Sequence, residues 1–350
     1  MGKVAVAVAM SGGVDSAVSA YLAQQQGYDV TGINLRLDDS PADETLEQCC
    51  EFLGIRLIRW DCRKYFQERV IIPAAEVYNA GKTPNPCCEC NQVLKFAELL
   101  RAADANGIDK VLTGHYVILD KNGAGEFILR CGRDRRKDQS YFLYRLTQYE
   151  LSRTGFPLGG LEKSEVRRIA EAASLPCASR PDSQDACFQI PGECCGETLR
   201  RRSGLPVRYG RFIHNGKVVG RHQGIHRYTV GQRQGLNVAL GVPGYISRID
   251  SANGDIFLTT EPDELLSSAF TVVRHNWVSG RMPAENGRIS VRVRYRNPGA
   301  GCHIKVLDEN RLLVIPDEPL RAVTPGQAAV FYAEDVMLGG GGIESVQKDV

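Results

Sequence analysis

An apolar run that leads directly into a glycine-rich turn dominates the start of the sequence. Residues 3–9 read KVAVAVA, residues 10–16 read MSGGVDS, and apolar residues then recur at helical spacing up to Gly27. A continuous apolar run is typical of a strand that is buried on both faces, as in a parallel sheet. The sequence therefore predicts a strand, a tight turn and a helix.

The same alternation continues through the first 120 residues. We expect further strands at 29–37, 55–60 and 109–116, and further helices at 43–54, 64–81 and 92–107. Strands that alternate with helices predict an α/β fold, here a doubly wound parallel sheet with helices on both faces. Between two of these helices, residues 82–91 (KTPNPCCECN) are so rich in Pro and Cys that we expect no regular structure there.

The sequence changes character after about residue 205. Short runs of alternating polarity follow one another, separated by turns such as Asn-Gly and Gly-Asp, which is typical of β structure. We therefore predict three domains: a catalytic α/β domain at 1–204, a small β-rich central domain at 205–267 and a C-terminal β-barrel at 268–350.

Composition excludes several classes of protein. No apolar run reaches the roughly 20 residues that a membrane-spanning helix needs, and the N-terminal segment lacks a signal-peptide cleavage site. We expect a cytoplasmic protein without a membrane partner. The twelve cysteines are then mostly reduced thiols, because nothing in the sequence indicates secretion. A net charge of +2 means that any RNA contact must be local.

The glycine-rich turn is suited to bind phosphate. Backbone N–H groups and the helix dipole attract anions at a helix start, Gly12 and Gly13 permit a close approach, and Ser11 and Ser16 add hydroxyl donors. A Walker loop would place a lysine after the glycines, and none is present here. The plain alternative is a turn without a ligand, but the full order of strand, SGGVDS and helix favours a phosphate site.

The SGGVDS stretch resembles the PP-loop of the ATP pyrophosphatases, whose fold is that of the adenine nucleotide alpha hydrolases. This resemblance implies that ATP is split between its α and β phosphates and that the pyrophosphate lies in the loop. Asp15 would hold Mg²⁺ or orient the phosphates. Amidotransferase-type synthetases, argininosuccinate synthase, a tRNA lysidine-forming enzyme and tRNA thiolases share this loop, so other segments must decide the substrate.

Several further segments narrow the choice. They are GKTPNPCCECN at 81–91, TGHY at 113–116, KDQSYFLYRL at 137–146, DSQDACF at 182–188, GQRQGL at 231–236 and AVTPGQAAVFY at 322–332. Together they resemble the tRNA-specific 2-thiouridylases from about residue 4 to 345. The family adenylates the C2 oxygen of the wobble uridine in the anticodon stem-loop of tRNA and replaces that oxygen with sulfur. The resemblance therefore implies ATP, Mg²⁺, tRNA and a persulfide or sulfide donor, such as a cysteine desulfurase or a sulfur-relay protein.

The resemblance also assigns roles to individual residues. Cys187 takes the place of the persulfide carrier, Cys90 that of the second catalytic cysteine, and Asp15 joins them in the catalytic set. The expected nucleotide contacts are Ala9, Met10, Ser11, Gly12, Gly13, Val14, Asp15, Ser16, Leu35 and Gly114. The expected tRNA contacts are Asn85, Pro86, Cys87, His115, Lys137, Asp138, Gln139, Arg294, Tyr295 and Gln327. His115 could equally contact the nucleotide or be structural.

The sulfur chemistry leaves three alternatives. Cys87 stands where many family members have an aspartate, so Cys87, Cys90 and Cys187 could hold a [4Fe–4S] cluster with one open position. The same thiols could instead work without metal, as a persulfide and a transient disulfide. They could also bind structural zinc. Cys88 has no explanation in this pattern, and we assign no role to Cys194 and Cys195.

Three basic segments predict an RNA-binding cleft on an otherwise balanced chain. Residues 130–145 mix five arginines and a lysine with aromatic residues, and 200–202 and 292–296 add further arginines. A solvated surface is the plain alternative. Two rival functions stay open, namely another PP-loop adenylating enzyme of the amidotransferase type, and a non-catalytic iron–sulfur or zinc protein that binds RNA.

Overall fold

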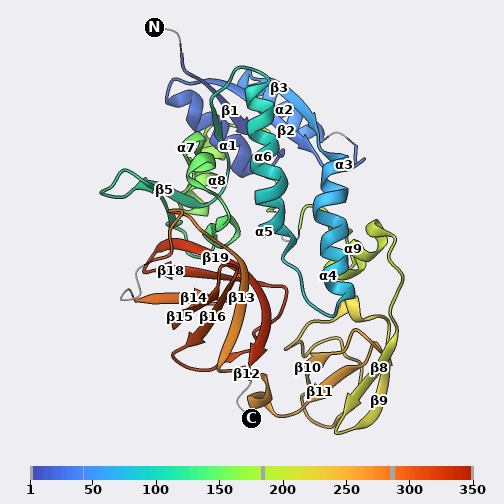
Figure 1. Ribbon diagram of the computed structural model, residues 1–350. Helices are drawn as coiled ribbons and strands as arrows, with labels where there is room; N and C mark the ends of the chain where they lie inside the picture. Colours follow the sequence, from blue (N-terminus) through green and yellow to red (C-terminus); the bar gives the residue numbers. More distant parts are fainter. Residues whose placement is uncertain (1–2, 42, 183–185, 284–287, 348–350) are drawn as a thin grey trace.

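The computed structural model describes residues 3–41, 43–182, 186–283 and 288–347 (Figure 1). A parallel sheet with its helices occupies one end of the molecule, and two β-rich parts occupy the other end. The predicted fold class is therefore confirmed. Within the described ranges, no helix is both long enough and apolar enough to cross a membrane.

The N-terminal sheet consists of five parallel strands in the order β3-β2-β1-β4-β7. These strands are β1 (Ala5–Ala9), β2 (Asp29–Arg36), β3 (Arg56–Asp61), β4 (Lys110–Leu112) and β7 (Thr154–Gly155). The strand order reverses at β1, because β2 lies on one side of it and β4 on the other. In open parallel sheets, ligands bind outside the carboxyl ends of the strands at such a reversal.

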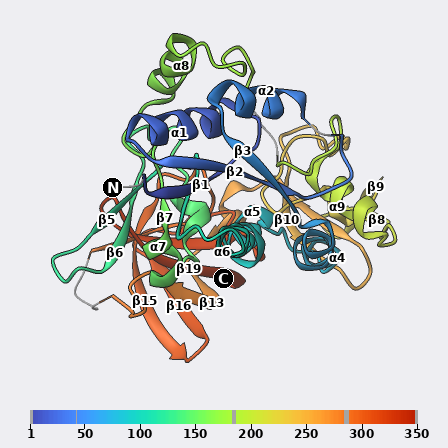
Figure 2. The ribbon, with the colours of Figure 1, turned by 90° about the horizontal axis from the view of Figure 1, so that it is seen from above.

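Strand β1 is buried on both faces, as its sequence predicts. Val6 and Val8 pack against α1 (Val14–Gln25) and α2 (Glu44–Leu53), whereas Ala7 packs against α6 (Ala97–Asp104) on the opposite face. Figure 2 shows α1 and α2 on one side of the sheet and α6 on the other. Successive side chains of a strand point to opposite faces, so only a continuous apolar run satisfies both helix layers.

Two composite helices connect the strands. One runs through α3 (Arg63–Phe66), the π-helical segment η1 (Gln67–Ile71) and α4 (Ile72–Asn79), and the other through α5 (Pro86–Cys90), the π-helical segment η2 (Asn91–Phe96) and α6. The prediction that 82–91 lacks regular structure is wrong from Pro86 onward. The Asn85 side chain accepts a hydrogen bond from the Cys88 N–H at 3.3 Å, and a proline in the first turn needs no partner for its nitrogen.

The central part is a four-stranded sheet in the order β10-β11-β8-β9. Its strands are β8 (Gly210–His214), β9 (Lys217–His222), β10 (Tyr245–Ile249) and β11 (Ile256–Thr259). The short helix η4 (Ile225–Arg227) connects this sheet to α9 (Cys195–Ser203), because His226 pairs with Glu197 at 2.6 Å. Further connecting elements are η3 (Ser140–Leu143), α7 (Gln148–Arg153), α8 (Lys163–Ala172), η5 (Pro262–Leu265), and the paired β12 (Leu266–Ser267) and β17 (Leu320–Arg321).

The C-terminal part is a closed barrel of six strands, as predicted. Its strands are β13 (Ala269–Trp277), β14 (Ile289–Arg292), β15 (Ala300–Asp308), β16 (Arg311–Pro316), β18 (Ala328–Ala333) and β19 (Val336–Gln347), and β13 pairs with β19 to close the ring. The hairpin β5 (Val117–Lys121) and β6 (Phe127–Cys131) extends this sheet from β19 (Figure 1). Residues that follow β4 thus join the C-terminal sheet, which the sequence does not indicate.

Candidate active site

A cavity of about 290 Å³ lies at the carboxyl ends of β1, β2 and β4. Its lining combines residues from distant parts of the chain: Ala9, Met10, Ser11, Asp15, Ser16, Ile33, Asn34, Leu35, Leu37, Leu94, Lys95, Leu99, Thr113, Gly114, His115, Gln139 and Cys187. Seven of the residues expected at the nucleotide are among them, together with the expected sulfur carrier. The cavity therefore lies where the strand order predicts a ligand site.

Hydrogen bonds inside the glycine-rich loop fix its shape. The Ser16 hydroxyl donates to the Gly13 carbonyl at 2.9 Å, and the Ser11 backbone N–H donates to the Ser16 hydroxyl at 3.2 Å. Gly13 precedes α1 without a side-chain cap. The N–H groups at the start of α1 thus keep their capacity to bind an anion.

Gly12 has no room for a side chain. Its φ is +79°, and an added Cβ would stand 2.8 Å from the Asp43 carboxylate. Arg180 holds this side of the loop, since it donates to the Gly12 carbonyl at 3.1 Å and to Asp43 at 2.6 Å. The loop conformation therefore depends on α2 and on the segment after α8, as well as on its own sequence.

Asp15 is held by two donors that the sequence analysis missed. Its Oδ1 accepts a hydrogen bond from the Tyr116 hydroxyl at 2.7 Å and an ion pair from Lys163 Nζ, also at 2.7 Å. Lys163 also reaches Asp182 at 3.0 Å, and its side chain is only 11% exposed. A largely covered lysine from the start of α8 thus brings positive charge to a loop whose own sequence contains none.

The two expected catalytic cysteines differ in exposure. Cys187 is exposed and lines the cavity, whereas Cys90 is buried in an apolar cluster with Phe66 and Leu94. Phe188, the neighbour of Cys187, belongs to that same cluster, which brings the two chain segments together. Burial raises the pKa of Cys90 to about 12, and the positive charge of Lys95 opposes that rise.

All twelve cysteines are free thiols. Burial raises the pKa of Cys87, which is only partly exposed. Within the described residues, no group of three or more His, Cys, Asp or Glu side chains is arranged to hold a metal ion. The set Cys87, Cys90 and Cys187 therefore does not form a cluster site in this conformation. Cys195 packs against the apolar cluster that contains Cys90, so it is not an isolated surface thiol.

His115 lies in the cavity wall as a neutral group. Its Nδ1 shares a hydrogen bond with the Thr113 hydroxyl at 2.8 Å, and its ring stacks on Phe96 with 5.8 Å between centroids. Burial lowers its pKa to about 3, and Lys95 adds to this shift. The imidazole is therefore uncharged at neutral pH, so it can offer a phosphate at most one neutral N–H donor.

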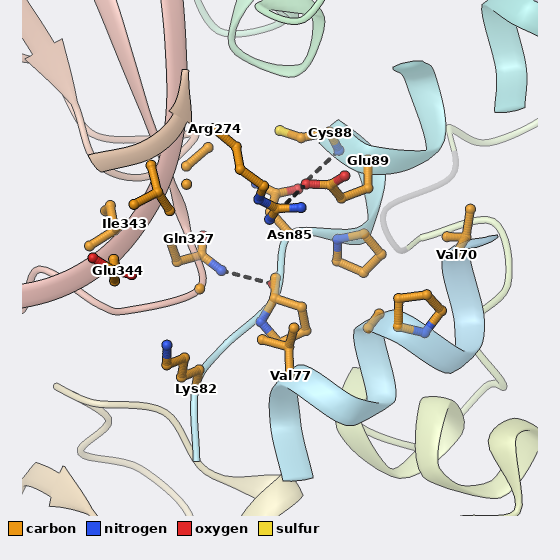
Figure 3. A pocket seen from close by; sticks show the side chains of 18 of the residues that line it. Val70, Val77, Lys82, Asn85, Cys88, Glu89, Arg274, Gln327, Ile343 and Glu344 are labelled. Atoms are coloured by element: carbon orange, nitrogen blue, oxygen red, sulfur yellow. Dashed lines mark hydrogen bonds and ion pairs between the residues drawn. The ribbon is translucent and has the colours of Figure 1, made fainter. Parts of the chain in front are cut away.

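A second cavity, of about 230 Å³, separates α4 and α5 from the barrel (Figure 3). Asn85 and Pro86 line it from one side and Gln327 from the other. The Gln327 amide donates to the carbonyls of Thr83 and Pro84 at 3.1 and 2.9 Å. Three of the residues expected at the tRNA thus meet across an interface between the first and last parts of the chain.

Of the expected tRNA contacts at 137–139, Asp138 is buried, whereas Lys137 and Gln139 are partly exposed. Lys137 pairs with Asp182 at 2.9 Å, and Gln139 accepts from the Tyr116 N–H at 3.0 Å. Asp138 is 4% exposed and pairs with Arg292 at 2.9 Å. Asp138 thus holds an arginine in place and presents little surface of its own.

Comparison with known proteins identifies the family. Residues 4–191 match the family model described as tRNA methyl transferase HUP domain, 202–260 the tRNA methyl transferase PRC-barrel domain, and 267–343 the aminomethyltransferase beta-barrel domain. A protein of Syntrophotalea carbinolica named tRNA-specific 2-thiouridylase MnmA is 42% identical, over 97% of this chain and 98% of its own length. The protein of the same name from Treponema denticola is 39% identical, over 98% of both chains. This chain belongs to the tRNA-specific 2-thiouridylase family.

Many arginines in the basic segments of this 2-thiouridylase family member pair with carboxylates. Arg200, Arg201 and Arg202 pair with Glu197, Glu193 and Asp38, which makes them part of the packing around α9. A separate arginine-rich surface borders a cavity of about 660 Å³ and is formed by Arg130, Arg135, Arg292 and Arg296 beside Tyr295. Asp335 pairs with Arg130 at 3.1 Å and with Arg135 at 3.9 Å, and Asp138 pairs with Arg292. Carboxylates thus partly neutralise the arginines where the β5–β6 hairpin meets the barrel, and an RNA contact at this surface stays a prediction.

Arg294 and Tyr295 have neighbouring positions but different surroundings. One guanidinium nitrogen of Arg294 donates to the carbonyls of Val230 and Ala322 at 3.1 and 2.9 Å, which links the central part to the barrel. The Tyr295 ring lies 4.5 Å from that of Phe142. In this 2-thiouridylase fold, Arg294 thus contributes to domain packing, whereas Tyr295 borders the arginine-rich surface.

Proposed function

We propose that this chain is an ATP-dependent tRNA 2-thiouridylase that replaces the C2 oxygen of the wobble uridine with sulfur. The observation that carries the proposal is a shared cavity, since Ser11, Asp15 and Ser16 of the phosphate loop line it together with Cys187. Adenylation modifies the C2 oxygen and sulfur attacks the C2 carbon bonded to it, so the phosphate loop and the sulfur carrier must reach one place. The names of the relatives support tRNA as the substrate.

In the first step, the C2 oxygen attacks the α-phosphorus of ATP, and the bond to the departing pyrophosphate breaks. The loop and the N–H groups at the start of α1 receive the pyrophosphate, because they bind anions without a lysine of their own. Asp15 suits Mg²⁺, which proteins commonly bind through one or two carboxylates together with phosphates and water. The ion would neutralise phosphate charge there, while Tyr116 and Lys163 hold the carboxylate.

In the second step, the terminal sulfur of a Cys187 persulfide attacks C2, and the C2–O bond breaks as AMP leaves. The Cys90 thiolate then attacks the Cys187 sulfur, which releases 2-thiouridine and leaves a Cys90–Cys187 disulfide. A thiol reductant must reopen that disulfide, and a persulfide donor must reload Cys187. The exposure of Cys187 supports access by such a donor.

We derive no step through an iron–sulfur cluster, because the described residues form no group of three metal ligands. Chemistry on one base also requires that the base leave its stack. We propose that the cavity at Asn85, Pro86 and Gln327 borders the extruded uridine, and that Arg130, Arg135, Arg292 and Arg296 contact tRNA phosphates.

The test is thiolation in vitro with tRNA, ATP, Mg²⁺, a persulfide donor and a thiol reductant, followed by detection of thiouridine on a mercury gel. We expect thiouridine with the wild type, and with Cys187→Ser we expect pyrophosphate release without thiouridine. Full thiolation by Cys187→Ser would contradict the assignment of the sulfur carrier. An amidotransferase-type enzyme would require ammonia and no Cys187, and a non-catalytic RNA-binding protein would release no pyrophosphate.

A further inference from the structure

Lys95 is a lysine in the cavity wall to which sequence reasoning assigned no role. It lines the same cavity as Ser11, Asp15 and Cys187. Among the described residues, neither a carboxylate nor a hydrogen-bond acceptor pairs with its ammonium group. An ammonium in a partly buried wall loses hydration, and a bound anion would compensate for that loss.

The π-helical turn explains how Lys95 reaches this wall. Lys95 lies in η2, five residues after Cys90, and a π-turn closes i→i+5 hydrogen bonds. Residues five positions apart therefore lie nearly on the same side of the helix, which they would not in a regular α-helix. Leu94 and Phe96 are fully buried on either side of Lys95. Their burial fixes this turn of the helix against the core, and Lys95 between them lines the cavity.

The cavity divides into walls with different charge. On the loop side, Lys163 already pairs with the Asp15 carboxylate. On the opposite side, His115 is neutral, and Leu94 and Leu99 are apolar. Lys95 is thus the cationic side chain that the η2 wall presents to a bound ligand.

We propose that Lys95 binds the α-phosphate of the nucleotide, the phosphate that stays on adenosine when pyrophosphate leaves. This inference rests on the proposed function and names a further nucleotide-binding residue for it. The loop at the start of α1 accounts for the pyrophosphate, and Cys187 marks the place of sulfur transfer. The α-phosphate must lie between them, because it bonds first to pyrophosphate and then to the base oxygen. Lys95 would stabilise the charge that grows on that phosphate as AMP departs.

The test compares the binding of AMP, adenosine and inorganic pyrophosphate to wild type, Lys95→Met and Lys95→Arg, by isothermal titration with Mg²⁺ present. We expect Lys95→Met to weaken the affinity for AMP about tenfold or more, because a charge-assisted hydrogen bond is lost. The affinities for adenosine and pyrophosphate should stay within about threefold of the wild-type values. Lys95→Arg keeps the charge and should retain AMP within about threefold. Lys64→Met, at an exposed lysine of α3, is the matched control and should change none of the three.

Unchanged AMP binding in Lys95→Met would overturn the inference, and so would an equal loss of AMP and adenosine, which indicates a packing effect. A loss confined to pyrophosphate would also overturn it, because Lys95 would then belong to the loop site. If Lys95→Met does not fold, Lys95→Arg is the deciding variant. A loss of AMP affinity in Lys95→Arg, with adenosine and pyrophosphate affinities unchanged, would contradict a role for the positive charge. AMP binding requires neither tRNA nor sulfur. If the wild type makes no thiouridine in the thiolation assay, the proposed function is refuted. If Lys95→Met nevertheless binds AMP more weakly than the wild type, the phosphate contact of Lys95 still stands.

Discussion

Removal of the Tyr116 hydroxyl isolates the positioning of Asp15. Tyr116 is 3% exposed and packs with Val14 and Ala17, so phenylalanine fills the same space without a cavity. The substitution Tyr116→Phe removes only the 2.7 Å hydrogen bond to Asp15 Oδ1. A hydrogen bond to a charged group contributes about 1.5–3 kcal/mol. Lys163 still pairs with the same oxygen, so we expect the lower end, about 1.5 kcal/mol.

That loss corresponds to about a tenfold slower adenylation, because 1.4 kcal/mol is a factor of ten. The assay is pyrophosphate release with saturating ATP, Mg²⁺ and tRNA, and the control is Tyr21→Phe, a partly buried tyrosine at the same apolar cluster. In an Asp15→Asn background the Tyr116 substitution should have a much smaller effect, as a double-mutant cycle would measure. An unchanged rate for Tyr116→Phe, or full additivity with Asp15→Asn, would refute the idea that Tyr116 acts through Asp15.

Two further predictions concern the contact between α9 and the central part. Gly196→Ala places a Cβ 1.7 Å from the His226 carbonyl oxygen, so urea unfolding should show a loss of about 2 kcal/mol or more, whereas Gly160→Ala, with open space around it, should cost far less. The ion pair with Arg200 lowers the pKa of Glu197 from 4.5 to about 2, so its stabilisation is present above pH 4.5 and disappears as pH falls toward 2. Burial lowers the pKa of His226 below 6.5, so the free energy of unfolding also falls as pH drops below 6.5. A midpoint of urea unfolding that does not change between pH 7 and pH 3 would contradict both assignments.

Secondary structure was predictable from the sequence where its cause lies within one short stretch of residues. Burial of β1 on both faces requires a continuous apolar run, and the sequence shows that run. The helix that begins at Pro86 was missed because Pro and Cys disfavour a helix by composition, although Asn85 and Pro86 together form a good helix start. The hairpin of β5 and β6 was not foreseen as part of the barrel sheet, since no local pattern encodes a pairing between Arg130 and Val336.

Charges were the least predictable part of the site. Sequence reasoning counted Arg200 among the residues that bind RNA, but in the structure Glu197 pairs with it. It expected Asp138 at the tRNA, where folding buries this carboxylate against Arg292. The sequence shows the charge of each side chain, but only the fold decides which residue neutralises this charge.

The sequence by itself determined the strand, the glycine-rich loop and the helix, and it predicted there a phosphate site that lacks a lysine. Its resemblance to the 2-thiouridylases predicted the roles of Cys90 and Cys187. Only the tertiary structure decided that Lys163 pairs with Asp15 and that Lys95 faces the cavity. The physical reason is the distance in sequence between the residues that interact. A loop and its helix form from neighbouring residues, whereas a cavity wall combines side chains that only tertiary packing brings together.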